Sequence, residues 1–231
     1  MIRHALAPVL PSAATALGIP RTLGPENSRQ RILVTAEGPS FSGVALTFDD
    51  GPHPEGTPAM LELLARAGAR AMFFVVGEQV KRRPELVARI AGAGHLVGLH
   101  GHQHRLQLRL STAEVQADLV RGSAAIEEAI GLTPVWHRPP YGIYSAAGLG
   151  AARAAGMQPL LWSRWGRDWR KFTTPRRIAA RATRELGGGD VILLHDGDFY
   201  SAKDSHERTA AALALIMNEL AERKLDTVLP I

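Results

Sequence analysis

Two adjacent carboxylates, Asp49 and Asp50, end an apolar stretch and are followed by Gly-Pro. The preceding residues 44–46 are apolar and partly β-branched, which predicts a buried strand that runs into a turn. Ionised carboxylates are costly to bury unless a cation neutralises them, and neighbouring side chains of a strand point to opposite sides. The pair can therefore take two different roles at one small site. Taken alone, the tripeptide Asp-Asp-Gly also fits a solvated turn.

A second polar group, His100-Gly-His-Gln-His104, follows the apolar residues 96–99. Histidines four residues apart lie on one face if the segment turns helically, as a pair of metal ligands requires. Together with Asp50 they supply two imidazoles and one carboxylate, a set that suits zinc, cobalt and other first-row divalent ions. We predict that Asp50, His100 and His104 hold one divalent metal ion, with Zn²⁺ as the first choice. The alternative is a polar, partly exposed histidine-rich loop.

Strand and helix patterns alternate from residue 44 to the C-terminus and must position these residues. Strands are predicted at residues 44–50, 71–76, 96–100, 136–138, 160–165, 191–195 and 227–229, after a short entry strand at 32–34. Helices are predicted at residues 57–66, from about 84, and at 112–130, 146–155, 176–186 and 205–223. Such repeated βα units predict a parallel sheet in a single α/β domain, most simply a distorted (β/α)7-8 barrel. An open, doubly wound sheet is the alternative.

The polar candidates favour the barrel, because each lies at or just past the end of a different predicted strand. They are Asp49 with Asp50, His100, Arg138, Asp168 and His195. A barrel assembles its active site at the carboxyl ends of its strands. This shared placement is a stronger indication of an active site than any one motif.

The composition excludes several classes of protein and partner. The 231 residues contain no cysteine, which rules out disulfides and thiolate zinc sites. No apolar run approaches the roughly 18 residues of a membrane span. The net charge of +5 comes from scattered arginines without an aromatic-basic stripe, so we expect no nucleic-acid partner. Prolines interrupt the apolar N-terminal stretch, which makes a poor signal peptide and favours a cytoplasmic location over export. We expect residues 1–30 to form an arm or docked segment and residues 31–231 to form the domain.

Taken together, the motifs resemble those of a known family. The segments Thr47–Pro52, His100-x-x-x-His104, Arg138–Gly142, Asp168-Trp169 and Leu193–Asp196 are similar, in that order, to the motifs of the polysaccharide deacetylases, the NodB-homology or carbohydrate esterase 4 family. The resemblance runs from about residue 44 to the C-terminus. It implies a NodB-like distorted barrel that uses a divalent metal, usually zinc, to remove acetyl groups from N-acetylated sugars. Gly101 and Leu96 depart from the pattern, since the family usually carries Ser or Thr at the first position and often Glu at the second.

The resemblance also implies how the catalytic residues divide the work. Asp49 would take a proton from the attacking water, and Arg138 would fix and neutralise Asp49. His195 would protonate the leaving nitrogen while Asp168 holds it as imidazolium, because a neighbouring carboxylate favours the charged form. His195 paired to Asp196 as a plain strand-end histidine is the alternative.

The remaining site residues would bind the substrate. The backbone N–H of Tyr141 would stabilise the oxyanion, and Leu193 and Trp169 would line a pocket for the acetyl methyl group. Trp165 is also predicted to face the groove, whereas Trp136 and Trp162 are assigned to the core.

The substrate implied by the resemblance is an N-acetylglucosamine-containing glycan or oligosaccharide. An O-acetyl ester or a small amide on the same site is the second hypothesis. A carbohydrate-binding relative without turnover is the third, and the complete set of catalytic residues argues against it.

Overall fold

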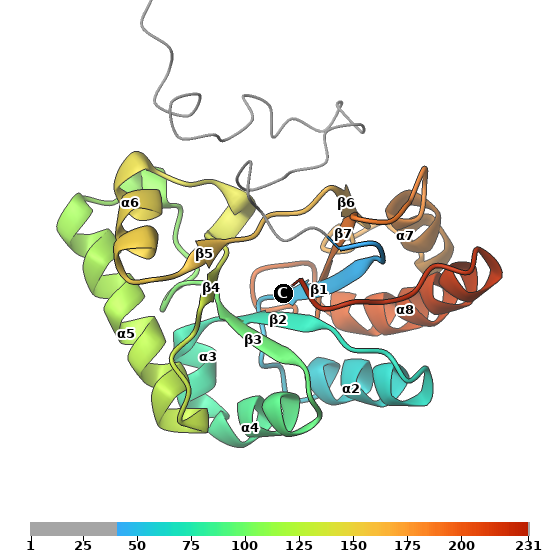
Figure 1. The fold of residues 1–231 in the computed structure, drawn as a ribbon, viewed down its shortest axis with the longest axis horizontal. Coiled ribbons are helices and arrows are strands. Elements are labelled where there is room, and N and C mark those ends of the chain that lie inside the picture. Colours follow the sequence, from blue (N-terminus) through green and yellow to red (C-terminus); the bar gives the residue numbers. More distant parts are fainter. Residues whose placement is uncertain (1–40, 231) are drawn as a thin grey trace, which may run out of the picture.

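The computed structural model describes residues 41–230, in which seven parallel strands form one curled sheet with helices packed outside it (Figure 1). The strand order is β5-β4-β3-β2-β1-β7-β6. The strands are β1 (Ala45–Asp49), β2 (Met72–Val75), β3 (Leu96–Leu99), β4 (Trp136–His137), β5 (Gln158–Pro159), β6 (Arg164–Trp165) and β7 (Val191–His195). Within the described range β5 and β6 do not pair, so the barrel is open on one side. The predicted distorted barrel is confirmed, and the predicted arm and the entry strand at 32–34 lie outside the described residues.

Helices connect the strands and cover the outside of the sheet (Figure 1). They are α2 (Gly56–Arg66), α3 (Gly77–Arg82), α4 (Pro84–Gly92), α5 (Thr112–Ile130), α6 (Ala146–Ala154), α7 (Pro175–Ala182) and α8 (Ser205–Glu222), with 3₁₀ turns η1 (Gln107–Arg109) and η2 (Pro140–Gly142). At the start of α5 the Glu114 N–H donates to Ser111 Oγ and the Ser111 N–H donates to the Glu114 carboxylate, which forms a capping box. Among the described helices, none combines the length and the apolar character of a bilayer span.

The strands have two chemically different faces, because their side chains alternate. In β1, Leu46 and Phe48 belong to the main core between the sheet and the helices, whereas Ala45 belongs to a smaller core on the inner face. Thr47 and Asp49 share the parity of Ala45, so they lie on this inner face as well. In β7 the same rule puts His195 on the inner face, directly across from Asp49 in the β1–β7 register.

The predicted strand at 160–165 is wrong and is replaced by two short strands at opposite edges of the sheet. β5 pairs with β4, and β6 pairs with β7. Between them the chain crosses the open side of the barrel (Figure 1). The carbonyls of Leu160 and Leu161 there accept hydrogen bonds from the Arg138 side chain, at 2.8 and 3.0 Å. A buried side chain thus takes the place of a strand partner for this segment. The predicted strand at 227–229 is reduced to a single bridge between Val44 and Thr227.

One polar strand residue, His137 of β4, lies on the helix-covered face of the sheet, because it pairs in register with Leu99 of the main core. His137 is fully buried and lacks a partner on one ring nitrogen among the described residues. Its Nδ1 lies 2.8 Å from the Tyr144 hydroxyl, and that hydroxyl donates to the His137 carbonyl at 2.9 Å. Because the Tyr144 hydroxyl donates its only proton to this carbonyl, His137 Nδ1 must be protonated and donate to the hydroxyl oxygen. Nε2 has no hydrogen-bond partner in the described part of the chain. Burial, together with the nearby His100, lowers the pKa of His137 to about 3.

An unfolded histidine has a pKa of about 6.5. Between about pH 6.5 and 3, His137 is therefore protonated in the unfolded chain but neutral in the folded chain. The free energy of unfolding therefore falls as the pH drops from about 6.5 towards 3. We expect His137→Phe to remove this contribution, so that between pH 7.5 and 5.5 the wild type loses about 1 kcal/mol more than the variant. Urea unfolding at both pH values measures the difference. Parallel pH profiles would contradict a buried, neutral His137.

Candidate active site

A pocket opens at the carboxyl ends of the strands and collects most of the predicted site residues. Those that line it are Asp49, Asp50, His100, His104, Tyr141, Trp169, Leu193 and His195. Arg138 and Asp168 are fully buried behind its wall. Residues from β1, β7 and the segments that follow β1, β3, β4 and β6 thus converge on one site, as the sequence predicted from their positions at strand ends.

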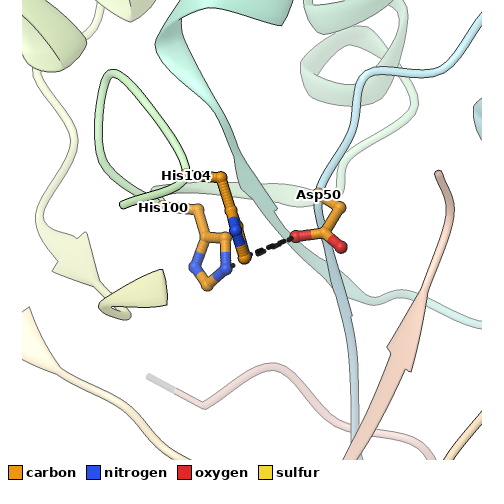
Figure 2. A group of neighbouring side chains, drawn as sticks. All are labelled: Asp50, His100 and His104. Atoms are coloured by element: carbon orange, nitrogen blue, oxygen red, sulfur yellow. Dashed lines mark ion pairs between the residues drawn. The ribbon is translucent and has the colours of Figure 1, made fainter. Parts of the chain in front are cut away.

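The predicted metal ligands form one compact group (Figure 2). Asp50 Oδ1 lies 3.3 Å from His104 Nε2 and 3.6 Å from His100 Nε2. These separations exceed good hydrogen bonds, and Asp50 Oδ1 has no hydrogen-bond partner among the described residues. Burial lowers the pKa of both His100 and His104 to about 3, which keeps both rings in the neutral, metal-binding form. An orphaned carboxylate oxygen facing two neutral imidazoles fits a divalent cation.

Two features of the backbone hold this group. Asp50 adopts φ +80°, an uncommon left-handed conformation for a residue with a side chain, at the end of β1. Gly101, also at φ +80°, makes the turn between the two histidines, and a Cβ there would come 2.9 Å from Asp118 Oδ2. The Asp118 carboxylate accepts the N–H groups of His102 and Gln103, at 2.7 and 3.2 Å. This contact occupies the space that a larger residue at position 101 would need.

Asp49 is held by the buried side chain of Arg138. Arg138 Nη1 donates to Asp49 Oδ1 at 2.7 Å and to Thr47 Oγ1 at 2.9 Å. The other Asp49 oxygen, Oδ2, lies 3.7 Å from His100 Nε2. Burial raises the pKa of Asp49, and the adjacent Arg138 charge opposes that rise. Arg138 therefore favours the ionised form of a carboxylate that burial alone would protonate.

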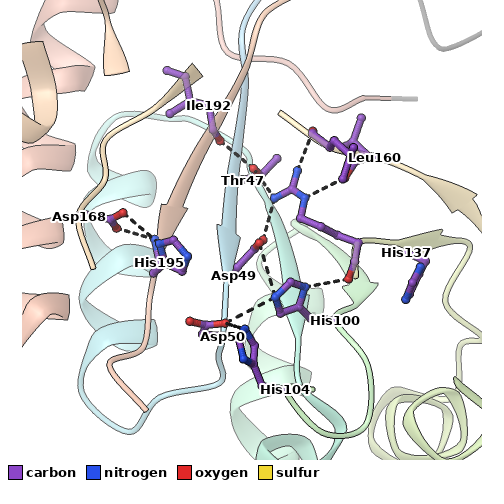
Figure 3. Close-up of polar contacts among 12 residues, drawn as sticks. Thr47, Asp49, Asp50, His100, His104, His137, Leu160, Asp168, Ile192 and His195 are labelled. Carbon is purple, nitrogen blue, oxygen red and sulfur yellow. Dashed lines mark hydrogen bonds and ion pairs between the residues drawn. The ribbon is translucent and has the colours of Figure 1, made fainter. Parts of the chain in front are cut away.

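His195 faces the pocket from the other side, with Asp168 behind it (Figure 3). His195 Nδ1 lies 3.0 Å from Asp168 Oδ1, and Asp168 Oδ2 accepts the His195 N–H and the Thr209 hydroxyl. Burial opposes the charged ring, but the Asp168 carboxylate outweighs it and the pKa of His195 rises to about 10. The alternative pairing with Asp196 is not formed, because Asp196 accepts the Thr57 hydroxyl instead. With Nδ1 engaged, Nε2 is the nitrogen left for a substrate.

Aromatic side chains form the rest of the wall. Trp165 and Trp169 line the pocket as predicted, and the Trp169 ring lies 5.4 Å from that of His195. Trp162 packs against the inner core, in line with the prediction, but it is only partly buried and also lines the pocket, with its ring 5.6 Å from the Arg138 guanidinium. Trp136 is buried as predicted. Tyr141 lies at the pocket edge, with φ +63° and 58% of the residue exposed.

Sequence reasoning missed Asp118 and Tyr200. Asp118 lies inside α5 and Tyr200 in the loop between β7 and α8, and neither belongs to a motif. Tyr200 lines the pocket and stacks on His104, with ring centroids 4.3 Å apart. Only the three-dimensional contact identifies either residue, because a lone Asp or Tyr in a sequence indicates no particular function.

A second group, His53, Asp198 and His206, has the composition of a metal site but the wrong hydrogen bonds. His53 Nδ1 accepts the N–H of Gly56 at 3.0 Å, so its proton resides on Nε2, the nitrogen that faces Asp198 at 3.3 Å. A protonated nitrogen has no lone pair for a metal. This arrangement fits a hydrogen-bonded cluster that anchors the loop after β7.

Comparisons with known proteins agree with this geometry. The sequence profile of the family described as polysaccharide deacetylase matches residues 37–160. A peptidoglycan-N-acetylglucosamine deacetylase of Bacillus cereus is 36% identical over 182 residues, 78% of this chain and 82% of the relative. A chitooligosaccharide deacetylase of Bradyrhizobium sp. is 35% identical over 187 residues, 78% of this chain and 85% of the relative.

The same relationship is evident in three dimensions. The structure of a family 4 carbohydrate esterase from Streptomyces lividans, in complex with acetate, superposes with a TM-score of 0.73 at 32% identity and covers 81% of this chain and 92% of that one. The profile covers the strands from β1 to β5, and the two relatives match more than three quarters of the chain. The chain therefore belongs to the polysaccharide deacetylase family.

Proposed function

We propose that the protein is a metal-dependent hydrolase that removes N-acetyl groups from N-acetylglucosamine-containing glycans or oligosaccharides. The observation that carries this proposal is the placement of two different acid–base groups around one ligand set. Asp49 and Asp50 lie on one side of the pocket and the His195–Asp168 pair on the other. The names of the two relatives, which act on peptidoglycan N-acetylglucosamine and on chitooligosaccharide, support the substrate class.

Asp50, His100 and His104 would hold the metal, for which zinc is the first choice and cobalt a substitute. When bound there, a divalent cation makes water more acidic and polarises a carbonyl group. The chain's own contribution is a rigid, neutral pair of imidazoles. His100 is fixed by a 2.8 Å contact between its Nδ1 and the Arg138 carbonyl, which leaves Nε2 free to face Asp50.

Asp49 acts as the general base and accepts a proton from the attacking water. Its position beside Asp50 would favour a protonated carboxyl, since burial and a like charge both raise a carboxyl pKa. The Arg138 guanidinium, 2.7 Å from Asp49 Oδ1, counters this and favours the ionised base. Oδ2 carries no such bond to Arg138 and is the oxygen available for the proton.

His195 acts as the general acid. Its ring is protonated at neutral pH, because its pKa is raised to about 10, and Nε2 delivers the proton to the departing amine nitrogen. The Tyr141 N–H stabilises the negative charge on the carbonyl oxygen, and one such donor is worth roughly 3 kcal/mol of barrier. Leu193 and Trp169, which both line the pocket, enclose the acetyl methyl group.

Acetate release from acetylated chito-oligosaccharides tests the proposal. We expect the zinc-loaded protein to release acetate, removal of the metal with a chelator to abolish the release, and added zinc or cobalt to restore it. Full activity of the metal-free protein would exclude this mechanism. The matched readout is the free amine on the product, which appears only if an amide bond is cleaved.

The same assay separates the alternative hypotheses. Acetate without a new amine, from an O-acetylated sugar, would favour an esterase. Sugar binding without acetate from any substrate would favour a binding protein, although the described pocket retains Asp49, His195 and the three metal ligands.

A further inference from the structure

The two histidines of the ligand group are oriented by different means. His100 Nδ1 lies 2.8 Å from the Arg138 carbonyl, which fixes its ring plane and tautomer. His104 Nδ1 is buried and has no hydrogen-bond partner in the described part of the chain. Histidines that bind metals almost always donate their second ring N–H to a carboxylate, carbonyl or water. His104 therefore needs another source of orientation.

Aromatic contacts surround the His104 ring instead. The Tyr200 ring stacks on it, with centroids 4.3 Å apart and an interplanar angle of 10°. The Tyr141 ring meets it edge-on, with centroids 4.6 Å apart at 63°. Because Tyr141 is 58% exposed, its ring is the less constrained of the two, and Tyr200 provides the flat surface against which His104 lies.

Tyr200 is itself fixed by residues of α3. Its hydroxyl donates to Glu78 Oε1 at 2.7 Å and accepts from Gln79 Nε2 at 3.4 Å. The start of α3 is joined to the histidine loop as well, since the N–H of Glu78 donates to the His102 carbonyl at 2.9 Å. The loop after β7, the start of α3 and the loop after β3 thus form one connected support around His104.

We propose that Tyr200 is a positioning residue that sets the plane of the His104 ring for metal binding, with Glu78 and Gln79 holding Tyr200 in place. The inference rests on the proposed function, because it requires His104 to be a metal ligand. In this proposal the stacked Tyr200 ring orients His104, just as the Arg138 carbonyl orients His100. Tyr200 comes from a loop outside the motifs. Because Tyr200 acts through His104, its loss should weaken metal binding directly and reduce turnover only as a consequence.

Direct metal binding tests the proposal without substrate. We expect Tyr200→Leu to weaken zinc binding about tenfold, the lower end of the effect of losing an outer support of a metal ligand. Tyr200→Phe keeps the ring that stacks on His104 but loses its hydroxyl bonds, and we expect a loss of less than about threefold, the lower end of the effect of one hydrogen bond. The cobalt-loaded Leu variant should also show a changed visible absorption spectrum, because the spectrum reports the geometry around the ion.

Phe199→Leu is the matched control. Phe199 is the neighbouring aromatic residue of the same loop, but its ring packs on His53, at 4.9 Å, and not on His104. We expect this variant to keep the wild-type zinc affinity and cobalt spectrum. If Tyr200→Leu also keeps both, or if Phe199→Leu loses as much affinity as Tyr200→Leu, the positioning role is overturned. A wild-type protein that binds no zinc would overturn the proposed function and this inference together, whereas zinc binding with no acetate release would overturn the proposed function alone.

Discussion

Asp49→Asn is expected to reduce kcat for acetate release by about 10² to 10⁴, the usual range for loss of a general base, while zinc still binds. Asparagine keeps an oxygen that can accept the Arg138 bond but cannot take up the proton of the attacking water. The proposed metal ligands are left untouched, since Asp50 Oδ1 contacts His100 and His104 independently of Asp49. A loss in kcat with little change in zinc affinity separates a base from a ligand.

The variant also places a neutral group beside the buried Arg138 charge, so its stability must be measured. Asp190→Asn is the matched control. Asp190 is 4% exposed and pairs with Arg164 at 3.3 Å, at the end of the sheet opposite to the pocket. We expect this control to lose stability but to keep its rate per folded molecule. A wild-type rate for Asp49→Asn would remove Asp49 from the role of base.

The sequence predicted the frame of this site because its signals are local. The apolar stretches before Asp49 and His195 are buried strands, and strand alternation alone places both residues on the inner face. The predicted strand at 160–165 failed for a tertiary reason, since the carbonyls of Leu160 and Leu161 bond to the Arg138 side chain. No pattern within residues 160–165 indicates that partner.

The distinction between local sequence signals and tertiary contacts also applies to the site residues. The motifs identified the groups that would react, because their residue types and strand-end positions are visible in the sequence. The residues that support these groups could not be identified from the sequence. Tyr200 reaches His104 across 96 positions of the sequence, and Asp118 holds the histidine loop from within α5. Such contacts depend on how loops and helices pack, which hydrophobic periodicity does not encode.

Arg138→Met is expected to lower the free energy of unfolding by about 3 to 5 kcal/mol, the usual result of removing one partner from a buried ion pair. Arg138 is fully buried and covers the Phe74 ring at 4.1 Å. Its guanidinium satisfies Asp49, Thr47 and the two carbonyls of the crossing segment, and methionine replaces none of these bonds. Urea unfolding measures the loss. A change of less than about 1 kcal/mol, as for an exposed pair, would contradict it.

The same substitution should also abolish acetate release, because Asp49 without Arg138 is a buried carboxyl that holds its proton. The double variant Asp49→Asn with Arg138→Met separates these two effects. Since no buried charge is left alone, we expect it to be less destabilised than the two single losses added together, by about 0.5 to 3 kcal/mol. The double variant should remain inactive, because avoiding an unpaired buried charge does not supply a general base. A double variant that regained both stability and turnover would mean that Arg138 serves only the fold and that another group removes the proton from water.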